Sequence, residues 1–279
     1  MYDTITEGLT YHPEEKKFEA TYPFVKDPNN LPNNKEIVKR IFHSNERRLM
    51  KSESKAKQYN EQIIDMLRRG VCREVTQEEL DAYIGPVFYI SHHAVFKPES
   101  RSTPCRIVFN ASANNNGHRL NDYFVKGPQL LNDLLGLLLC FQEERYAIVG
   151  DIKKMFHSIR TSKLDQMFHL FFWRFLDELV PPRIFSTTAV NFGDKPSSAL
   201  AITALHKTAE RGRDISEEAA KVTKSNSYMD DIIDSKMHST EAHQEMNDID
   251  SILEEGRFCL LYTSPSPRDR TRSRMPSSA

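Results

Sequence analysis

Two adjacent carboxylates, Asp230 and Asp231, lie between two short strand-like runs in the segment SNSYMDDIIDS, residues 225–235. This pattern predicts a β-hairpin with acidic residues at its tip. An Asp-Asp pair at a turn is usually just solvated, because aspartate favours turn positions. A metal site is the second interpretation, since Mg²⁺ prefers hard oxygen ligands such as carboxylates. The choice depends on whether the fold brings another acid to the hairpin.

Asp151 is the candidate for that further acid, because it directly follows the apolar run 146–149. If that strand and the hairpin are neighbours in one sheet, Asp151 would lie beside Asp230 and Asp231. Two metal ions roughly 3.5–4 Å apart can activate an attacking hydroxyl and stabilise a leaving oxygen. The sequence therefore predicts a two-metal site, on the condition that these strands are adjacent.

Composition narrows the class of protein. The 279 residues are 28% charged and 39% hydrophobic, and we expect one large unit with a sizeable core. No apolar run approaches the roughly 18 residues of a membrane span, and the N-terminus lacks a signal pattern, so we expect no membrane association or secretion. Four cysteines without C-x-x-C spacing argue against a disulfide framework or a zinc site. The net charge of −1 argues mildly against nucleic-acid binding, which would then depend on local basic clusters.

Residue periodicity gives a coarse map of the elements. Residues 1–30 are polar, interrupted by Pro23 and Pro28, and are predicted to form an extended lead-in. Apolar residues at helical spacing predict helices over 35–50 and 55–69. β-Branched and aromatic runs predict strands at 87–90, 94–97 and 106–109, the last two joined as a long-looped hairpin.

The second half of the chain is predicted to add helices. The leucine-rich stretch 130–139 is expected to be a buried helix. A helix is expected to start near Pro196, which suits a first helical turn, and another spans 240–255.

Residues 259–279, CLLYTSPSPRDRTRSRMPSSA, differ from the rest of the chain. They are rich in Ser, Pro and Arg without periodicity, which predicts disorder. The string also resembles one reading frame of a sequencing adapter, so we expect it to be translated from non-biological DNA, with the biological chain truncated at Phe258. A natural Ser/Pro/Arg tail is the alternative.

Several segments together resemble one protein family. YMDD and DIKKMF resemble motifs C and A of a reverse transcriptase. Further segments agree, in order and spacing, with the BEL/Pao class of LTR retrotransposon polymerases over about residues 10–258. These segments are LPNN, NERRLM, YNEQI, HHAVFKPESRSTPCRIVFNAS, RLNDYFVKGP, GDIKKMFHSI, FFWR and NFGDKPSSALAI.

The resemblance implies a fold. It is an α+β right-hand polymerase fold in residues 31–258, with fingers and a palm built on an antiparallel sheet and with the thumb missing. The helices of 35–69 and the hairpin of 87–109 would belong to the fingers, and 126–160 with 190–258 largely to the palm.

The resemblance also implies an activity: RNA-directed DNA polymerase, transferring deoxynucleotides to a primer 3′-hydroxyl. Its partners would be an RNA template, a DNA primer and dNTPs, in a cytoplasmic virus-like particle. The family places an aspartic protease upstream, and thumb, connection, ribonuclease H and integrase regions downstream. Without them, the fragment is expected to extend a primer poorly.

The metal ligands implied by the resemblance are Asp151, Asp230 and Asp231, with the backbone of Ile152 near the metal or the triphosphate. The cofactor would be two Mg²⁺ ions, with Mn²⁺ as an alternative.

Three residues are implied in dNTP binding. Arg106 matches an arginine that binds the triphosphate, and Lys97 is a second cation, although a lysine in a polar loop is often only solvated. Phe156 matches a steric gate that would clash with a ribose 2′-hydroxyl, whereas core packing is its alternative explanation.

Template and primer contacts are implied at four positions, namely Gly193, Ser197, Tyr228 and Met229. A turn and a helix cap would equally explain Gly193 and Ser197. Gly256 resembles the glycine of a later palm motif. Asn110 and Ala199 depart from the family pattern, which has Asp and commonly Pro there.

Two rival functions remain at this point. One is a catalytically inactive polymerase-like module that binds nucleic acid. The other is a structural protein in which YMDD is accidental. His92-His93 does not add a metal-site hypothesis, because adjacent strand residues point to opposite faces.

Overall fold

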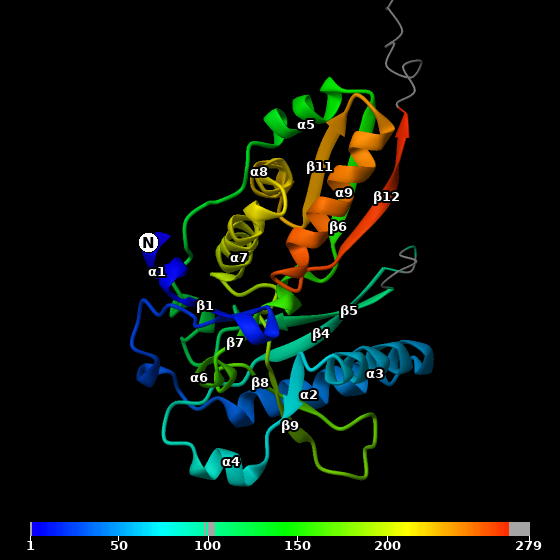
Figure 1. Cartoon of the computed structure of the whole chain (residues 1–279). Helices are drawn as coiled ribbons and strands as arrows, with labels where there is room; N and C mark the ends of the chain where they lie inside the picture. Colours follow the sequence, from blue (N-terminus) through cyan, green and yellow to red (C-terminus); the bar gives the residue numbers. More distant parts are fainter. Residues whose placement is uncertain (1, 98, 100–103, 268–279) are drawn as a thin grey trace, which may run out of the picture. The chain divides into compact units, whose positions relative to one another are not determined.

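The computed structural model describes residues 2–97, 99 and 104–267, which divide into two compact units (Figure 1). Unit 1 comprises Met1–His12, Phe18–Pro128 and Phe156–Leu200, and unit 2 comprises Pro13–Lys17, Gln129–Met155 and Ala201–Ala279. One large unit was expected from length and composition, and within it the contacts form two groups. Each unit has its own sheets and its own buried apolar residues, so the contacts separate into two groups.

Unit 1 contains three small sheets with the strand orders β1-β2-β7, β3-β9-β8 and β4-β5. The strands are β1 (Leu9–His12), β2 (Lys17–Ala20), β3 (Cys72–Glu74), β4 (Ser91–Phe96), β5 (Cys105–Asn110), β7 (Arg160–Thr161), β8 (Leu170–Trp173) and β9 (Arg183–Thr187). The helices are α1 (Tyr2–Glu7), α2 (Lys35–Leu49), α3 (Glu53–Arg68), α4 (Gln77–Ala82) and α6 (Lys163–Gln166), with short 3₁₀ turns η2 (Pro28–Asn30), η3 (Leu120–Asp122) and η4 (Met155–Ser158).

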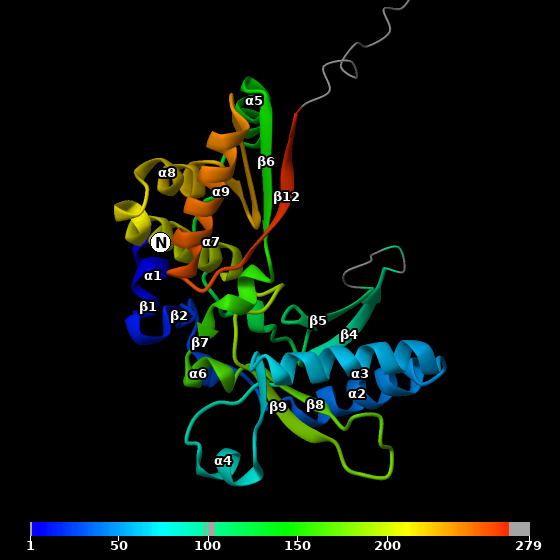
Figure 2. The same ribbon diagram turned by 45° about the vertical axis from the view of Figure 1, so that its right-hand side comes forward.

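The two predicted helices at 35–50 and 55–69 are confirmed as α2 and α3, and Figure 2 shows them side by side next to the hairpin β4–β5. Their apolar rows are buried, yet the row on α2 includes Glu46. Arg174 explains this acid, because its Nε and Nη2 atoms lie 2.9 and 2.6 Å from the two carboxylate oxygens of Glu46. A bidentate pair of this kind compensates a buried charge.

The segment 1–30, predicted to be an extended lead-in, is folded instead, and most of it belongs to unit 1. Residues 2–20 form α1, β1 and β2, and β2 pairs in parallel with β7 through the register Glu19–Arg160. The side chains of Ile5 and Phe18 are buried, and their removal from water stabilises the fold of this segment. The segment is polar on average, so its composition does not reveal these two core residues.

The strand predicted at 87–90 is only partly correct. Only Tyr89 makes a bridge, to Leu170, while the N–H groups of Phe88 and Ile90 donate to the carbonyls of Met167 and Leu170. The segment is extended and hydrogen-bonded, but the regular hairpin begins at β4, which pairs with β5 from Ser91–Asn110 to Phe96–Cys105.

Unit 2 is built on one antiparallel sheet with the strand order β10-β11-β6-β12. Its strands are β10 (Ser227–Tyr228), β11 (Asp231–Lys236), β6 (Tyr146–Ile152) and β12 (Leu260–Pro267), and its helices are α5 (Leu134–Glu143), α8 (Glu217–Ser225) and α9 (Ser239–Glu254), with 3₁₀ turns η1 (Pro13–Glu15) and η5 (Gly212–Asp214). Helix α7 (Ser197–Arg211) contributes residues to both units. The predicted helices near Pro196 and at 240–255 are confirmed as α7 and α9.

The two faces of this sheet differ in burial. Helix α9 lies along one face (Figure 1), where Ile148 and Ile232 are fully buried. Side chains alternate between faces along a strand, so Asp151 and Asp231 point to the opposite face, where both are exposed. One face thus forms the core of unit 2, and the other presents acidic residues to solvent.

Helix α5 corrects the prediction of a buried leucine helix over 130–139. The helix begins at Leu134, and of its five leucines only Leu137 is buried, at 5% exposure. The other four are 44–66% exposed and are Leu134, Leu135, Leu138 and Leu139. The helix is apolar on every side, whereas the strands it contacts, β11 and β6, cover only one side.

Strand β12 corrects the prediction of disorder for part of 259–279. Residues 260–267 pair with β6, and the Tyr262 hydroxyl donates to the Met246 carbonyl of α9. The alternation of Leu260 and Tyr262 supplies apolar side chains to the α9 face, which favours a strand. Residues 268–279 lie outside the described residues, and the adapter origin of the segment stays a prediction.

Truncation of leucines on α5 tests this burial pattern. Leu137→Ala should lower the free energy of unfolding by roughly 2–3 kcal/mol, because it removes a buried side chain and leaves a cavity. The matched variant Leu135→Ala, on the same helix, should change it by less than about 0.5 kcal/mol. Urea unfolding followed by circular dichroism measures both values, and equal losses would contradict the orientation of α5.

Candidate functional site

The in-register pairing of β11 with β6 places Asp231 directly opposite Asp151. The Ile152 N–H donates to the Asp230 carbonyl at 2.6 Å, so Asp231 and Asp151 occupy a non-hydrogen-bonded pair. Facing side chains lie closest in pairs of this type. The strand adjacency on which the predicted carboxylate site depended is therefore confirmed.

The turn between β10 and β11 adds the third carboxylate. Tyr228 pairs with Asp231, leaving Met229 and Asp230 as a two-residue connection. Met229 adopts a left-handed backbone with φ 57°, which costs a non-glycine residue roughly 1–2 kcal/mol. The predicted strand-turn-strand around Met229 is confirmed, and the turn keeps Asp230 next to the Asp151–Asp231 pair.

The three aspartates form an uncompensated negative site. No described residue forms an ion pair with any of them. Partial burial and the neighbouring Asp230 raise the pKa of Asp151. Partial burial, Asp230 and then Asp151 raise the pKa of Asp231. Asp230 thus makes both Asp151 and Asp231 harder to ionise, as is expected where like charges share a site.

The donor set suits a hard divalent cation, but the side chains are not gathered around a common point. Among the described residues, no group of three His, Cys, Asp or Glu is arranged to hold a metal ion. The backbone places the three carboxylates on adjacent positions, so rotation about their own side-chain bonds is the adjustment that coordination would need. The Ile152 N–H already donates to the Asp230 carbonyl. The carbonyl of Ile152 is therefore the backbone group that remains for the predicted contact with the metal or the triphosphate.

A buried charge cluster, which sequence reasoning missed, lies under β11 on the α9 face. The Lys236 ammonium lies 2.8 Å from Glu245 Oε1, 3.3 Å from Asp234 Oδ2 and 2.7 Å from Glu218 Oε1. Asn226 also donates to Asp234 at 2.9 Å. Burial, and then the adjacent Asp234, raise the pKa of Glu245 to about 8. In the sequence, Asp234 could have indicated this cluster, because it lies two residues after Ile232 and therefore on the same face of the strand.

The two predicted dNTP-binding cations belong to unit 1. Arg106 is exposed on β5, opposite Val95, and no described acidic residue pairs with it. Lys97 is exposed directly after β4, and its N–H donates to the Pro104 carbonyl. Both side chains are exposed cations, and their role in dNTP binding stays a prediction.

Phe156, the predicted steric gate, is buried in unit 1. Its ring lies 4.2 Å, between centroids, from the half-exposed ring of Phe192. This packing agrees with the alternative explanation of Phe156 as a core residue. The aromatic pair presents Phe192 rather than Phe156 to solvent, a feature that the sequence did not suggest.

The loop 191–197 holds both Gly193 and Ser197. Gly193 has φ +95°, a conformation that requires glycine, and its carbonyl accepts from the Asn121 amide at 2.8 Å. The Ser197 hydroxyl is buried and donates to the Asn191 carbonyl at 2.7 Å. The predicted turn at Gly193 is confirmed. Ser197 is the first residue of α7 rather than its cap, because its hydroxyl donates to a carbonyl and does not accept from a helix N–H. Direct template contact stays a prediction.

A buried polar network, also missed from the sequence, holds this loop. Asp194 Oδ2 lies 2.9 Å from the Tyr22 hydroxyl and 2.9 Å from His169 Nε2, and all three side chains are buried. The Asn191 N–H donates to the same tyrosine hydroxyl. The carboxylate of Asp194 favours the protonated form of His169 and raises its pKa despite burial. The N-terminal segment therefore anchors the loop of Gly193.

The remaining highlighted positions have structural explanations. A Cβ at Gly256 would come within 2.3 Å of the Thr208 hydroxyl, so close packing requires glycine there. Ala199 is buried, and a Cβ added at Gly127 would lie 2.6 Å from its Cβ, which explains a small residue at 199. Asn110 is exposed and accepts from the Ser112 N–H. His92 is buried and bonded to the Phe172 carbonyl rather than sharing a ligand site with His93.

No protein-family profile and no curated protein matches the sequence. Solved structures do resemble the fold. The foamy viral protease-reverse transcriptase in complex with RNA/DNA hybrid aligns with a TM-score of 0.55 at 18% identity, over 75% of this chain and 24% of that chain. A complex of the foamy viral protein with double-stranded DNA gives 0.51 and 19% over 70% and 28% of the two chains. The Prototype Foamy Virus CSH mutant gives 0.53 and 19% over 75% and 24%.

This chain therefore has a fold like that of reverse transcriptases, and it spans about a quarter of the length of the proteins it matches. The fold is a mixed α/β one with small, mainly antiparallel sheets. No helix among the described residues is both long and apolar enough to cross a bilayer.

Removal of one carboxylate tests the electrostatics of the site. Because the pKa of Asp151 is raised, the unfolded chain loses this proton at a lower pH than the folded chain, so stability falls as pH rises above about 3.8. Asp151→Asn should stabilise the chain at neutral pH, in EDTA, by less than about 1 kcal/mol, since the group is exposed. The gain should vanish at a pH below the ordinary aspartate range.

Mg²⁺ should stabilise the parent chain and the control Asp214→Asn, but not Asp151→Asn. Equal Mg²⁺ effects on the three chains would count against metal binding at this site.

The buried cluster predicts a separate pH dependence. With a pKa of about 8 in the folded state and an ordinary value of 4.5, Glu245 makes stability fall as pH rises between these values. Glu245→Gln should flatten urea unfolding midpoints across this window. Glu218→Gln removes a carboxylate that contacts the same lysine from an exposed position, and should keep the parent's pH dependence. A flat profile in the parent chain would contradict the assignment.

Proposed function

We propose that this chain is a polymerase domain that adds deoxynucleotides to a primer 3′-hydroxyl on a nucleic-acid template, as a reverse transcriptase does. The observation that carries the proposal is the Asp151–Asp231 pair, with Asp230 beside it, on the exposed face of the unit 2 sheet. The similarity to foamy viral reverse transcriptases, solved with RNA/DNA hybrid or DNA, supports a nucleic-acid partner.

The exposed sheet face suits this reaction. A phosphodiester backbone and a triphosphate are both anionic, and three unpaired carboxylates would repel them. Two bound Mg²⁺ ions would reverse that charge, activate the primer hydroxyl and stabilise the leaving pyrophosphate. Asp151 and Asp231 would hold the ions from adjacent strands, with Asp230 and the Ile152 carbonyl as further oxygen donors.

The strand and the turn that carry the aspartates are held in place by neighbouring contacts. Phosphoryl transfer depends on positioning and electrostatics more than on covalent chemistry. The buried Asp234–Lys236–Glu245 cluster fixes β11 against α9, and the strained turn at Met229 fixes Asp230. The aspartates are therefore carried by elements that cannot easily shift in register.

The other predicted binding residues have proposed roles of their own. Arg106 and Lys97 would bind the triphosphate of the incoming dNTP, since both are exposed cations. Phe156, with the tilted ring of Phe192 packed against it, would limit the space at the ribose 2′ position. Gly193 and Ser197 would shape the loop that supports the template, and Tyr228 and Met229 would contact the primer.

The finer family assignment is also a proposal. The ordered motifs support the BEL/Pao class of LTR retrotransposons, in which this chain would act as part of a longer polyprotein in a virus-like particle. RNA as the template, Mg²⁺ as the ion and dNTPs as the substrates belong to the same proposal.

Single-nucleotide incorporation into a DNA primer on an RNA template, with the chain in excess and Mg²⁺ present, tests this function. Asp151→Asn and Asp230→Asn should each reduce incorporation by roughly 10²-fold or more, because each removes a charged group needed at the reacting phosphate. EDTA should abolish it.

Asp214→Asn is the matched control, since it removes an exposed aspartate of unit 2 away from the sheet, and should leave the rate unchanged. Template-primer binding without any metal-dependent incorporation would favour the inactive nucleic-acid-binding module. Incorporation that survives Asp151→Asn would contradict the assigned ligands.

A further inference from the structure

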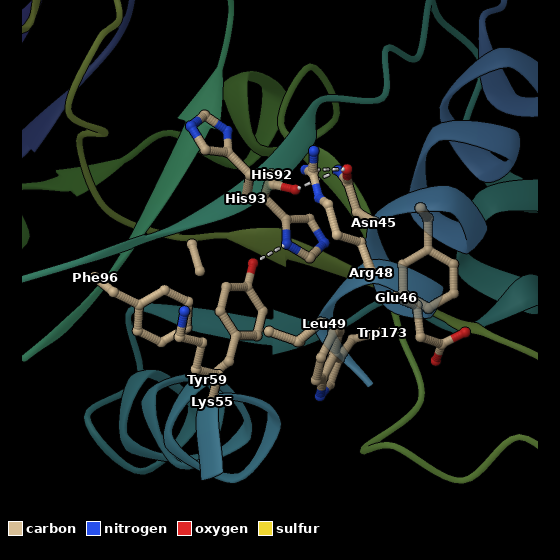
Figure 3. Close-up of a pocket in the computed structure, with 12 residues that line it drawn as sticks. Asn45, Glu46, Arg48, Leu49, Lys55, Tyr59, His92, His93, Phe96 and Trp173 are labelled. Carbon is tan, nitrogen blue, oxygen red and sulfur yellow. Dashed lines mark hydrogen bonds between the residues drawn. The ribbon is translucent and has the colours of Figure 1, made fainter. Parts of the chain in front are cut away.

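A second candidate site lies within unit 1, in a pocket between α2, α3 and β4 (Figure 3). The pocket has a volume of about 440 Å³, within the range that holds small ligands. Its wall is unusually aromatic, and includes Phe42, Tyr59, His92, Phe96 and Trp173. None of these residues has a role in the proposed polymerase site.

The aromatic floor is held rigidly. The Tyr59 hydroxyl donates to His92 Nδ1, and His92 Nε2 donates to the Phe172 carbonyl at 2.9 Å. Burial lowers the pKa of His92 to about 4, so the imidazole is neutral and part of an apolar surface. Trp173 is held by its Nε1–H bond to Asn60 at 3.1 Å. A ligand would therefore meet a preformed floor, and little conformational entropy would be lost on binding.

The rim of the pocket carries two exposed cations. Arg48 is held by its bond to the Asn45 side-chain oxygen, at 2.9 Å. The Lys55 ammonium lies 5.2 Å from the centroid of the Phe96 ring. Figure 3 shows the two side chains next to each other. Glu46 also lines the pocket, but Arg174 neutralises it from behind. The pocket thus has an aromatic floor and a net positive rim.

The positive charge extends along the surrounding helices. Eight Lys or Arg residues, but only three Asp or Glu residues, lie between Lys35 and Lys57, in a chain whose net charge is −1. A local basic excess of this kind is the electrostatic signature of a polyanion-binding surface. Aromatic rings next to a basic surface are the combination that binds single-stranded nucleic acid, since bases stack and phosphates pair with cations.

We propose that this pocket binds one unpaired nucleotide of a single-stranded nucleic acid, with the base against Phe96 and the aromatic floor and its phosphate between Arg48 and Lys55. The choice of a nucleic acid over another aromatic anion rests on the proposed function. An anionic lipid surface would use the basic helices equally well, but it would leave the concave aromatic floor without a partner.

The chain contains a single tryptophan, Trp173, so its tryptophan fluorescence comes from one residue in the wall of this pocket. Titration of a short oligothymidylate into the chain, in EDTA and without dNTPs, should quench or shift this emission. An oligonucleotide of the same length without bases should bind several-fold more weakly. Base–aromatic stacking of about 1–3 kcal/mol corresponds to roughly five- to 150-fold in affinity.

Matched variants separate the pocket from general charge. Arg48→Ala combined with Lys55→Ala should weaken oligothymidylate binding by roughly ten-fold or more and remove the fluorescence change. Lys51→Ala combined with Lys57→Ala removes the same charge from the same segment, outside the pocket lining, and should have a much smaller effect. Phe96→Leu keeps an apolar side chain but removes the stacking ring, and should erase the preference for the oligonucleotide with bases.

Three outcomes would overturn the proposal: equal binding of the oligonucleotides with and without bases, equal losses in the two double variants, or a Trp173 response to anionic phosphatidylserine vesicles that oligothymidylate does not produce. Because no step of the titration needs Asp151, Asp230 or Asp231, its failure leaves the polymerase proposal standing. Conversely, failure of primer extension with a normal titration would leave the pocket standing as a nucleic-acid site.

Discussion

The pairing of β11 with β6 is the constraint on which the candidate site depends. In a sheet, a slip of one residue exchanges the two faces of a strand. Such a slip here would turn Asp231 toward α9 and expose Ile232, which is fully buried. The apolar face fixes the register, and the register in turn fixes the acidic pair. The strand register that buries the core of unit 2 therefore also positions its acidic site.

Charge compensation separates structural from functional ionic groups in this chain. The buried carboxylate of Glu46 is held by two nitrogens of Arg174, and the partly buried Lys236 is surrounded by carboxylates. The exposed Asp151 and Asp231 have no such partner in the part of the chain that the structure describes, and the Arg48–Lys55 rim keeps its positive charge because Glu46 is already satisfied. Uncompensated charge of either sign occurs where we propose that ligands bind: metal ions in unit 2 and phosphates in unit 1.

The sequence predicted the elements with a strong local signal and missed those that depend on neighbours. Helices α2, α3 and α9 follow from apolar spacing, and the acidic hairpin follows from its turn residues. The burial of α5 could not be predicted, because a helix that is apolar on all sides carries no information about which side is covered. Strands β2 and β12 form only because distant edges are available to pair with them.

The site was predictable as a set of residues but not as a geometry. Nothing local to Asp151 indicates that it faces Asp231, since the pairing links segments about eighty residues apart. The Tyr22–Asp194–His169 network gave no signal either, because each member is ordinary in its own segment. Long-range polar contacts of this kind appear only when the chain is folded.

The left-handed backbone at Met229 makes its turn sensitive to the side chain at that position. Glycine would adopt the same φ without strain, because it has no Cβ to clash with the backbone. The tip of the hairpin therefore carries the Met229 side chain in a conformation that a smaller residue would hold more easily.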